Sequence, residues 1–299
     1  TDGKVAWLLL REEDVTAYVR AGDSGTRPPE PESPDRDAVR GELYMRAREL
    51  ERVNEELQQA HTREQQVAIT LQEAMLAAPD LERHSNIAVR YLPAARSLHV
   101  CGDWYDLIDL DDNRFMVTVG DVVGYGLKAA AVMGILRSAL SAANRALERP
   151  QAALEVMGRH VQSFEDAVST TAVTVLVDRQ NRVITYSSAG HPPPILLHAD
   201  GSCELLDQAT DPPLGARPDP AVPRPQANLG YRPGDTLLLY TDGLVERRDE
   251  DIDVGLNRLI DILGESTGLS PDELADTVLE RLGVSDGTDD DIALITVGL

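Results

Sequence analysis

Aspartates and glycines cluster at four places where predicted hydrophobic strands begin or end. The four motifs are Cys101–Asp106, Gly120–Gly126, Tyr240–Gly243 and Asp289–Asp291. Carboxylates that converge without histidine or cysteine repel one another unless a hard divalent cation neutralises them. Oxygen-only ligation favours Mg²⁺, Mn²⁺ or Ca²⁺ over Zn²⁺. Because each motif alone is also typical of an ordinary turn, the sequence predicts a cation site only if the fold brings the motifs together.

The strands and helices that must position these motifs occupy residues 79–299. Runs of strand length are predicted at Ile87–Leu92, Trp104–Leu110, Arg114–Val119, Ala172–Val177, Val183–Ser187, Ile195–Leu197, Thr236–Tyr240 and Ile292–Val297. Helical patterns fall at Leu127–Leu147, which is apolar nearly all round and therefore expected to be buried, and at Ala152–Ala167, Val254–Leu263 and Pro271–Leu282. The elements come in blocks without strict alternation, which indicates an α+β fold with antiparallel sheets and packed helices.

A long helix is predicted over residues 39–78, upstream of this domain. It contains strong helix formers and a heptad seam, although Glu64 interrupts the leucine series. The leucines of one seam position are Leu43, Leu50, Leu57 and Leu71, and the other position holds Ala47, Asn54, His61, Ala68 and Met75. Asparagine at such a position fixes the register of parallel dimers. The helix is interpreted as a dimerising, regulatory coiled coil; the alternative is an amphipathic helix that packs against its own domain.

The N-terminal part divides into two short regions. Residues 1–22 contain one apolar strand and a charged stretch, too little for a core, so we expect them to be the end of a larger domain. Their ending Asp14-Val15-Thr16 resembles the last strand of a PAS sensor domain. Residues 23–38 are rich in proline and glycine and predict a linker.

The composition excludes several classes of protein. With 28 basic and 51 acidic residues the formal charge is −23, which disfavours a nucleic-acid partner. Two cysteines form neither a disulfide framework nor a metal-ligand pattern, which suits a reducing cytoplasm. No apolar run approaches the roughly 20 residues that a membrane span needs, so no membrane partner is expected.

Five motifs, taken in order, resemble those of a known enzyme family. They are CGDWYD, GDVVGYGLKAA, SSAGHPPP, YTDGLVE and DDDIALITV. The series is similar to the SpoIIE/RsbU-like branch of the PPM (type 2C-like) metal-dependent Ser/Thr protein phosphatases, and it covers residues 79–299. The resemblance implies two packed antiparallel β-sheets flanked by helices, in α-β-β-α layers, preceded by a regulatory linker helix.

The same resemblance implies a site for two Mn²⁺ or Mg²⁺ ions. Asp121 matches the aspartate that bridges both ions, and the backbone carbonyl of Val122 matches a further ligand. Asp103 matches the acid that serves the second ion, whereas Asp242 and Asp290 match ligands of the first.

Two neighbouring acids and one histidine leave alternatives open. Asp291 and Asp106 are the nearest competitors of Asp290 and Asp103 as ligands. His191 lies in a family motif and is interpreted as a turn and packing residue, not as a general acid.

The resemblance also implies a reaction and a partner. Two ions about 3.5–4 Å apart lower the pKa of a water, and the resulting hydroxide attacks the phosphorus of phosphoserine or phosphothreonine in line. The implied substrate is a phosphorylated STAS-type anti-sigma-factor antagonist in bacterial partner switching, under control of the upstream sensor and the dimerising helix. The alternatives are a weak or inactive phosphatase-fold signalling scaffold and a hydrolase of small phosphorylated molecules.

Overall fold

The computed structural model describes residues 34–75, 84–93, 102–124, 126–163, 169–217, 219, 222–285 and 290–299. The sensor-like residues 1–22 and linker residues 23–33 lie outside this set, and the four-region division stays a prediction. The chain forms two compact units, Thr1–Gln58 and Gln59–Leu299, and each is described by itself. Within the described residues, we find no helix with a run long and apolar enough to cross a membrane.

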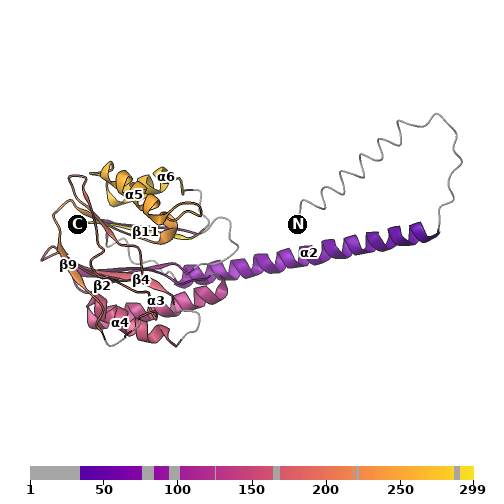
Figure 1. Cartoon of the computed structure of the whole chain (residues 1–299), viewed down its shortest axis with the longest axis horizontal. Helices are drawn as coiled ribbons and strands as arrows, with labels where there is room; N and C mark the ends of the chain where they lie inside the picture. The colour runs from indigo at the N-terminus through magenta and orange to yellow at the C-terminus, as the bar shows by residue number, and fades with distance from the viewer. Residues whose placement is uncertain are drawn as a thin grey trace. The chain divides into compact units, whose positions relative to one another are not determined.

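Helix α2 spans Pro34–Met75, so it begins earlier than residue 39, the predicted start (Figure 1). Proline suits the first turn of a helix because the missing N–H would have no partner there. Ion pairs between positions three and four apart, such as Arg46–Glu42 and Arg52–Glu49, add local support. Three leucines of the predicted seam are exposed: the exposed fraction of the residue is 62% for Leu43, 70% for Leu50 and 67% for Leu57. The side chains of Ala68, Leu71 and Met75 lie outside the described set.

A five-stranded and a six-stranded sheet form the centre of the second unit. The first has the order β1-β11-β10-β6-β7 and the second β2-β3-β4-β5-β8, with β9 paired to β5. The strands are β1 (Ile87–Leu92), β2 (Trp104–Asp109), β3 (Arg114–Asp121), β4 (Thr171–Asp178), β5 (Val183–Ala189), β6 (Ile195–Leu197), β7 (Cys203–Leu205), β8 (Thr210–Asp211), β9 (Ala227–Gly230), β10 (Thr236–Tyr240) and β11 (Ile292–Gly298). All pairs are antiparallel except β5 with β8.

Helices cover the outer face of each sheet, which confirms the predicted α-β-β-α arrangement (Figure 1). Helices α3 (Leu127–Leu147) and α4 (Pro150–Val161) pack on the second sheet, and α5 (Ile252–Gly264) and α6 (Pro271–Arg281) pack on the first. Strand β10 shows how: Leu237 and Leu239 face the other sheet, while Leu238 and Tyr240 face the helices. Both faces of the strand are therefore buried, as its continuous apolar run predicts.

Two helix predictions need correction. Helix α3 is not buried all round, because Ile135 is 45% exposed while Met133 and Leu136 are fully buried on the sheet side. Helix α4 begins at Pro150, another proline in a first turn, and ends at Val161, whereas the sequence pattern predicted 152–167. Residues 164–168 of that range lie outside the described set.

Candidate metal centre

The hairpin of β2 and β3 brings the first two acidic motifs together. Trp104 faces Gly120 in the register, so Asp103, just before β2, lies beside Asp121, at the end of β3. Gly102 makes this approach possible: Val122 N–H donates to its carbonyl at 3.2 Å, and a Cβ on Gly102 would lie 1.9 Å from the carbonyl oxygen of Val122. The chain before Asp103 therefore runs in backbone contact with the chain after Asp121.

Strands β10 and β11 bring the other two acidic motifs together in the same way. The backbone N–H of Thr241 donates to Ala293 O at 3.0 Å, and the Ala293 N–H donates to the Thr241 hydroxyl at 2.9 Å. A Cβ on Gly243 would lie 2.1 Å from the carbonyl oxygen of Asp291. Asp242 is thus held against the turn that carries Asp290 and Asp291.

Side chains from both sheets join the two halves. His191 is buried, with Nδ1 2.8 Å from the Thr171 hydroxyl on β4 and Nε2 3.1 Å from the Tyr240 carbonyl at the end of β10. Burial lowers the pKa of His191 to about 3, so the ring is neutral, donates from Nε2 and accepts at Nδ1. It therefore links the sheets structurally. The Tyr91 hydroxyl donates to Asp291 Oδ2 at 2.7 Å and ties β1 to the same centre.

Burial and mutual repulsion set the protonation of these acids. Burial, and then the charges of Asp121 and Asp291, raise the pKa of Asp103 well above its usual range, although a hydrogen bond from Thr241 opposes the shift. Burial and then Asp242 raise the pKa of Asp121 to about 7, and a hydrogen bond with Asp103 lowers it. Burial and Asp290 also raise the pKa of Asp242. Carboxylates from all four motifs therefore interact electrostatically.

This donor set fits a hard divalent cation. Every candidate side-chain donor is a carboxylate oxygen, the ligand type that Mg²⁺ and Mn²⁺ prefer. Asp103 Oδ2 is buried and has no hydrogen-bond partner among the described residues, so it has an unused acceptor at the centre of the cluster. In the part of the chain that the structure describes, no three acidic, histidine or cysteine side chains are already gathered as ligands of one ion. A cation would offset the repulsion that keeps uncompensated carboxylates apart.

Two other acidic positions from the sequence analysis lie outside the centre and have structural contacts. Asp106 points to helix α3, where its Oδ1 accepts from Arg137 Nη2 at 3.0 Å, so it is not brought to the cluster. In the acidic run 249–253, Asp251 caps helix α5 by accepting from the N–H of Asp253. The sequence reasoning missed Tyr91 and Thr241, which position acids of the centre. Thr241 directly precedes Asp242, and this adjacency was the only available signal.

Adding a methyl group at either close approach should disrupt the centre. We expect Gly243→Ala to lower the melting temperature and weaken Mn²⁺ binding at least about tenfold, because its Cβ would displace the Asp291 carbonyl. Calorimetric Mn²⁺ titration and thermal melts measure both effects. Gly230→Ala is the matched control, since its Cβ would lie 3.9 Å from the nearest atom. Equal Mn²⁺ affinities in the two variants would contradict the assignment of this turn to the centre.

Comparison with known proteins relates this chain to bacterial phosphatases. A sequence model of the family Stage II sporulation protein E (SpoIIE) matches residues 111–299. Phosphoserine phosphatase RsbP of Bacillus subtilis (strain 168) is 28% identical over 189 residues, covering 62% of this chain and 45% of RsbP. Phosphoserine phosphatase RsbU of the same organism is 25% identical over 197 residues, covering 65% of this chain and 57% of RsbU. The chain spans about half the length of these relatives.

Solved structures show the same fold. The RsbU and RsbW domains of Rv1364c from Mycobacterium tuberculosis superpose with a TM-score of 0.63 at 33% identity, covering 71% of this chain and 59% of that one. The SiaA-PP2C domain of Pseudomonas aeruginosa gives 0.65 at 20% identity, covering 83% of this chain and 98% of the other. The second similarity concerns the fold alone.

Proposed function

The chain belongs to the SpoIIE family, and on this premise we propose that it is a metal-dependent protein serine/threonine phosphatase. One observation carries the proposal: aspartates from both sheets interact at one centre, where Asp103 Oδ2 is buried and has no hydrogen-bond partner among the residues that the structure describes. Two relatives of this chain, RsbP and RsbU, are phosphoserine phosphatases.

The acids of the centre are the proposed ligands of Mn²⁺ or Mg²⁺, with two ions per site. Asp103, Asp121, Asp242 and Asp290 would supply carboxylate oxygens, and Val122 its backbone carbonyl. Asp291 remains the alternative to Asp290, although its Oδ2 already accepts from Tyr91. When bound, such ions supply Lewis acidity, which lowers the pKa of water and offsets charge on phosphoryl oxygens.

The surrounding residues of the chain have positioning roles. Thr241 joins the Asp242 turn to β11 and hydrogen-bonds to Asp103, so it couples the β10–β11 strand pair to the β2–β3 hairpin. His191 fixes the ends of β4 and β10 relative to each other, and because its ring is neutral near pH 7 it is not an imidazolium that could act as a general acid. Preorganised acids of this kind require little rearrangement when substrate binds, which is how a fixed site lowers an activation barrier.

The proposed substrate is a phosphorylated STAS-type anti-sigma-factor antagonist. Support comes from RsbU and RsbP, and from the solved structure that contains both RsbU and RsbW domains. An upstream sensor domain acting through helix α2 is the proposed regulator.

Substrate comparison tests this proposal. We expect phosphate release from a phosphoserine-carrying STAS domain in Mn²⁺, with kcat/KM at least about 10²-fold above that for nucleotides or p-nitrophenyl phosphate, because a protein substrate makes additional contacts. Equal or higher kcat/KM for the small molecules would favour a small-molecule hydrolase. No turnover of any substrate at saturating Mn²⁺ would favour the scaffold.

We also propose that helix α2 pairs with α2 of a second copy. The exposed leucines lie seven residues apart, and Asn54 lies at the other seam position. We expect the double variant Leu50→Asp, Leu57→Asp to be monomeric in sedimentation equilibrium where the wild-type protein is dimeric, because charges would be buried at the seam. Gln59→Asp, which adds an aspartate at an exposed position of the same helix outside the seam, is the control and should stay dimeric. A monomeric wild-type protein would contradict this pairing.

A further inference from the structure

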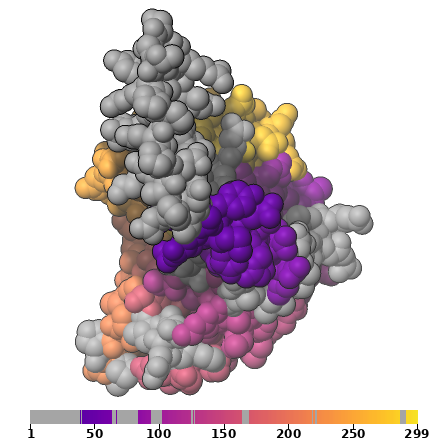
Figure 2. All heavy atoms as spheres, turned by 90° about the vertical axis from the view of Figure 1, so that its right-hand side faces the viewer, coloured from indigo at the N-terminus to yellow at the C-terminus, as the bar shows by residue number. Residues whose placement is uncertain are grey.

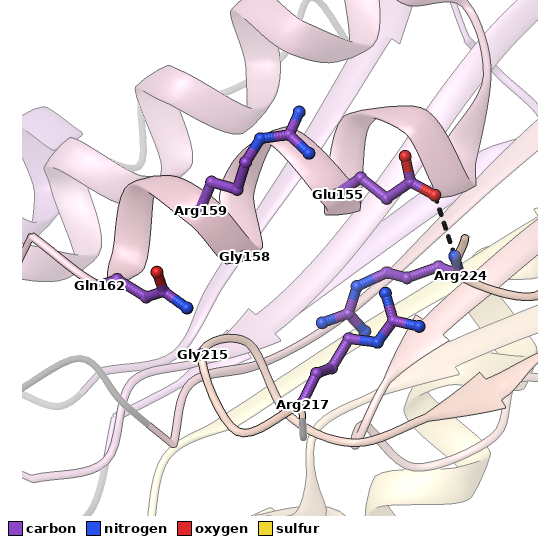
Figure 3. A pocket seen from close by; sticks show the side chains of 7 residues that line it. All are labelled: Glu155, Gly158, Arg159, Gln162, Gly215, Arg217 and Arg224. Carbon is purple, nitrogen blue, oxygen red and sulfur yellow. Dashed lines mark hydrogen bonds between the residues drawn. The ribbon is translucent and has the colours of Figure 1, made fainter. Parts of the chain in front are cut away.

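A pocket rich in arginine lies beside helix α4 (Figure 3). Its enclosed space is about 20 Å³, and together with the open mouth the space between the lining atoms reaches about 350 Å³. The lining residues are Glu155, Gly158, Arg159, Gln162, Gly215, Arg217 and Arg224. Three arginines around one pocket are unexpected in a chain whose formal charge is −23. This concentration of positive charge indicates a site for an anion.

Arg224 is the buried centre of this pocket. It is 3% exposed, and its Nη1 donates to the Pro212 carbonyl at 3.1 Å and lies 3.0 Å from Asp211 Oδ2. Its Nη2 is buried and has no hydrogen-bond partner in the described part of the chain. A buried guanidinium N–H without an acceptor is costly, since charged donors lose strong hydration. The pocket therefore contains a donor that a bound acceptor would satisfy.

The surrounding acids only partly balance the arginines. Arg217 Nε lies 2.8 Å from the same Asp211 Oδ2 that pairs with Arg224, so two guanidinium groups share one carboxylate oxygen. Glu155 Oε1 accepts from the backbone N–H of Arg224 at 2.9 Å, and Figure 3 shows it at the backbone end of that residue, not beside the guanidinium. Counting Arg159, three positive and two negative charges leave the pocket with a net charge of about +1.

Gly158 keeps the space beside the unpartnered nitrogen open. A Cβ at this position would lie 3.5 Å from Arg224 Nη2, so any side chain would occupy part of the volume next to it. Glycine in the middle of a helix costs stability relative to alanine, and here it lies inside α4. Gln162, at the end of α4, extends its side chain toward the pocket in Figure 3. The helix thus provides both an opening and a neutral donor.

We propose that this pocket binds a phosphate-class oxyanion, held by Arg224 Nη2 and Arg217, with Gln162 and Arg159 at its mouth. Guanidinium forks match the oxygens of such an anion. The anion is either free inorganic phosphate or a phosphoryl group carried on a protein. The site is separate from the acidic cluster: Asp211 lies on β8 and Asp121 on β3, three strands apart, or about 14 Å at ~4.8 Å per strand.

Calorimetric titration with inorganic phosphate in EDTA tests the proposal in the absence of divalent cations. Gly158→Ala should weaken phosphate binding at least about tenfold, because the methyl group would fill the space beside Nη2 that the anion needs, while the melting temperature stays equal or rises through better helix propensity. Arg159→Gln, at an exposed position, should weaken it about threefold through loss of charge. Arg232→Gln, an exposed arginine on the turn before β10, is the matched control and should bind as wild type.

The results first test whether the site exists and then identify the source of the anion. Weakened phosphate binding by Gly158→Ala without loss of thermal stability supports the site. A wild-type protein that does not bind phosphate, or a Gly158→Ala variant that binds it equally well, would overturn it. If the wild-type protein binds phosphate, a phosphoserine peptide is added next. Displacement of the bound phosphate by the peptide assigns the site to a phosphoryl group carried on a protein, and a lack of displacement assigns it to free inorganic phosphate.

Discussion

Asp242→Asn is expected to lower Mn²⁺-dependent phosphate release by at least about 10²–10³-fold, the range seen when one preorganised electrostatic contact is removed. Asp242 is held against the Asp290–Asp291 turn by the close approach at Gly243, and its pKa is raised by burial and by Asp290. An amide at this position keeps the size of the side chain but removes a negative ligand from a proposed cation site. Initial rates on the phosphoserine STAS domain at saturating Mn²⁺ measure the effect.

The matched control for this substitution is Asp249→Asn. Asp249 is an exposed residue of the acidic run 249–253, outside the centre, so its rate should stay within about twofold of wild type. If Asp242→Asn kept more than about a tenth of the wild-type rate, Asp242 would not be a ligand needed for the reaction.

Asp121→Asn is expected to move thermal stability in opposite directions without and with metal. Burial and Asp242 raise the pKa of Asp121 to about 7. Because the folded protein then binds a proton more tightly than the unfolded chain, stability falls as the pH rises from about 4 through about 7. At pH 8 in EDTA the aspartate is ionised and repelled, so the neutral asparagine should raise the melting temperature by about 2–4 °C or more.

In Mn²⁺ the wild-type protein should have the higher melting temperature of the two. At a hundred times its dissociation constant, a cation that binds only the folded wild-type protein adds ~2.7 kcal/mol, or roughly 5–10 °C for a domain of this size. Asp121→Asn should lose most of that gain, and melts at pH 8 with EDTA or Mn²⁺ give all four values. An unchanged Mn²⁺ shift in the variant would remove Asp121 from the site, and a lower melting temperature in EDTA would mean that its carboxylate stabilises the metal-free fold.

The sequence predicted the elements that have strong periodicity and missed those without it. Thr236–Tyr240 is apolar throughout and matches β10 at both ends. Strands β7, β8 and β9 have only three, two and four residues and include polar ones, whereas β6, also of three residues, is apolar throughout and was predicted. Helices α2 and α4 begin at Pro34 and Pro150, earlier than the predicted residues 39 and 152, and proline suits the first turn of a helix.

The sequence predicted the acids of the candidate centre but not the contacts that hold them in place. Acids at the ends of antiparallel neighbours meet because the pairing places the start of one strand beside the end of the other, as for Asp103 before β2 and Asp121 at the end of β3. The link from His191 to Thr171 and Tyr240 joins residues 20 and 49 positions apart on different sheets. No local pattern encodes such a contact. The same holds for Arg224 and Asp211, whose ion pair forms only through the fold.

The most direct test of the account is phosphate release from a phosphoserine STAS domain by the wild-type protein, measured across a Mn²⁺ titration beginning in EDTA. Calorimetric Mn²⁺ binding is followed in parallel. We expect no release in EDTA and a rate that rises with occupancy of the acidic centre. Release that is equally fast in EDTA, or full Mn²⁺ occupancy without release from any phosphoserine protein, would contradict it.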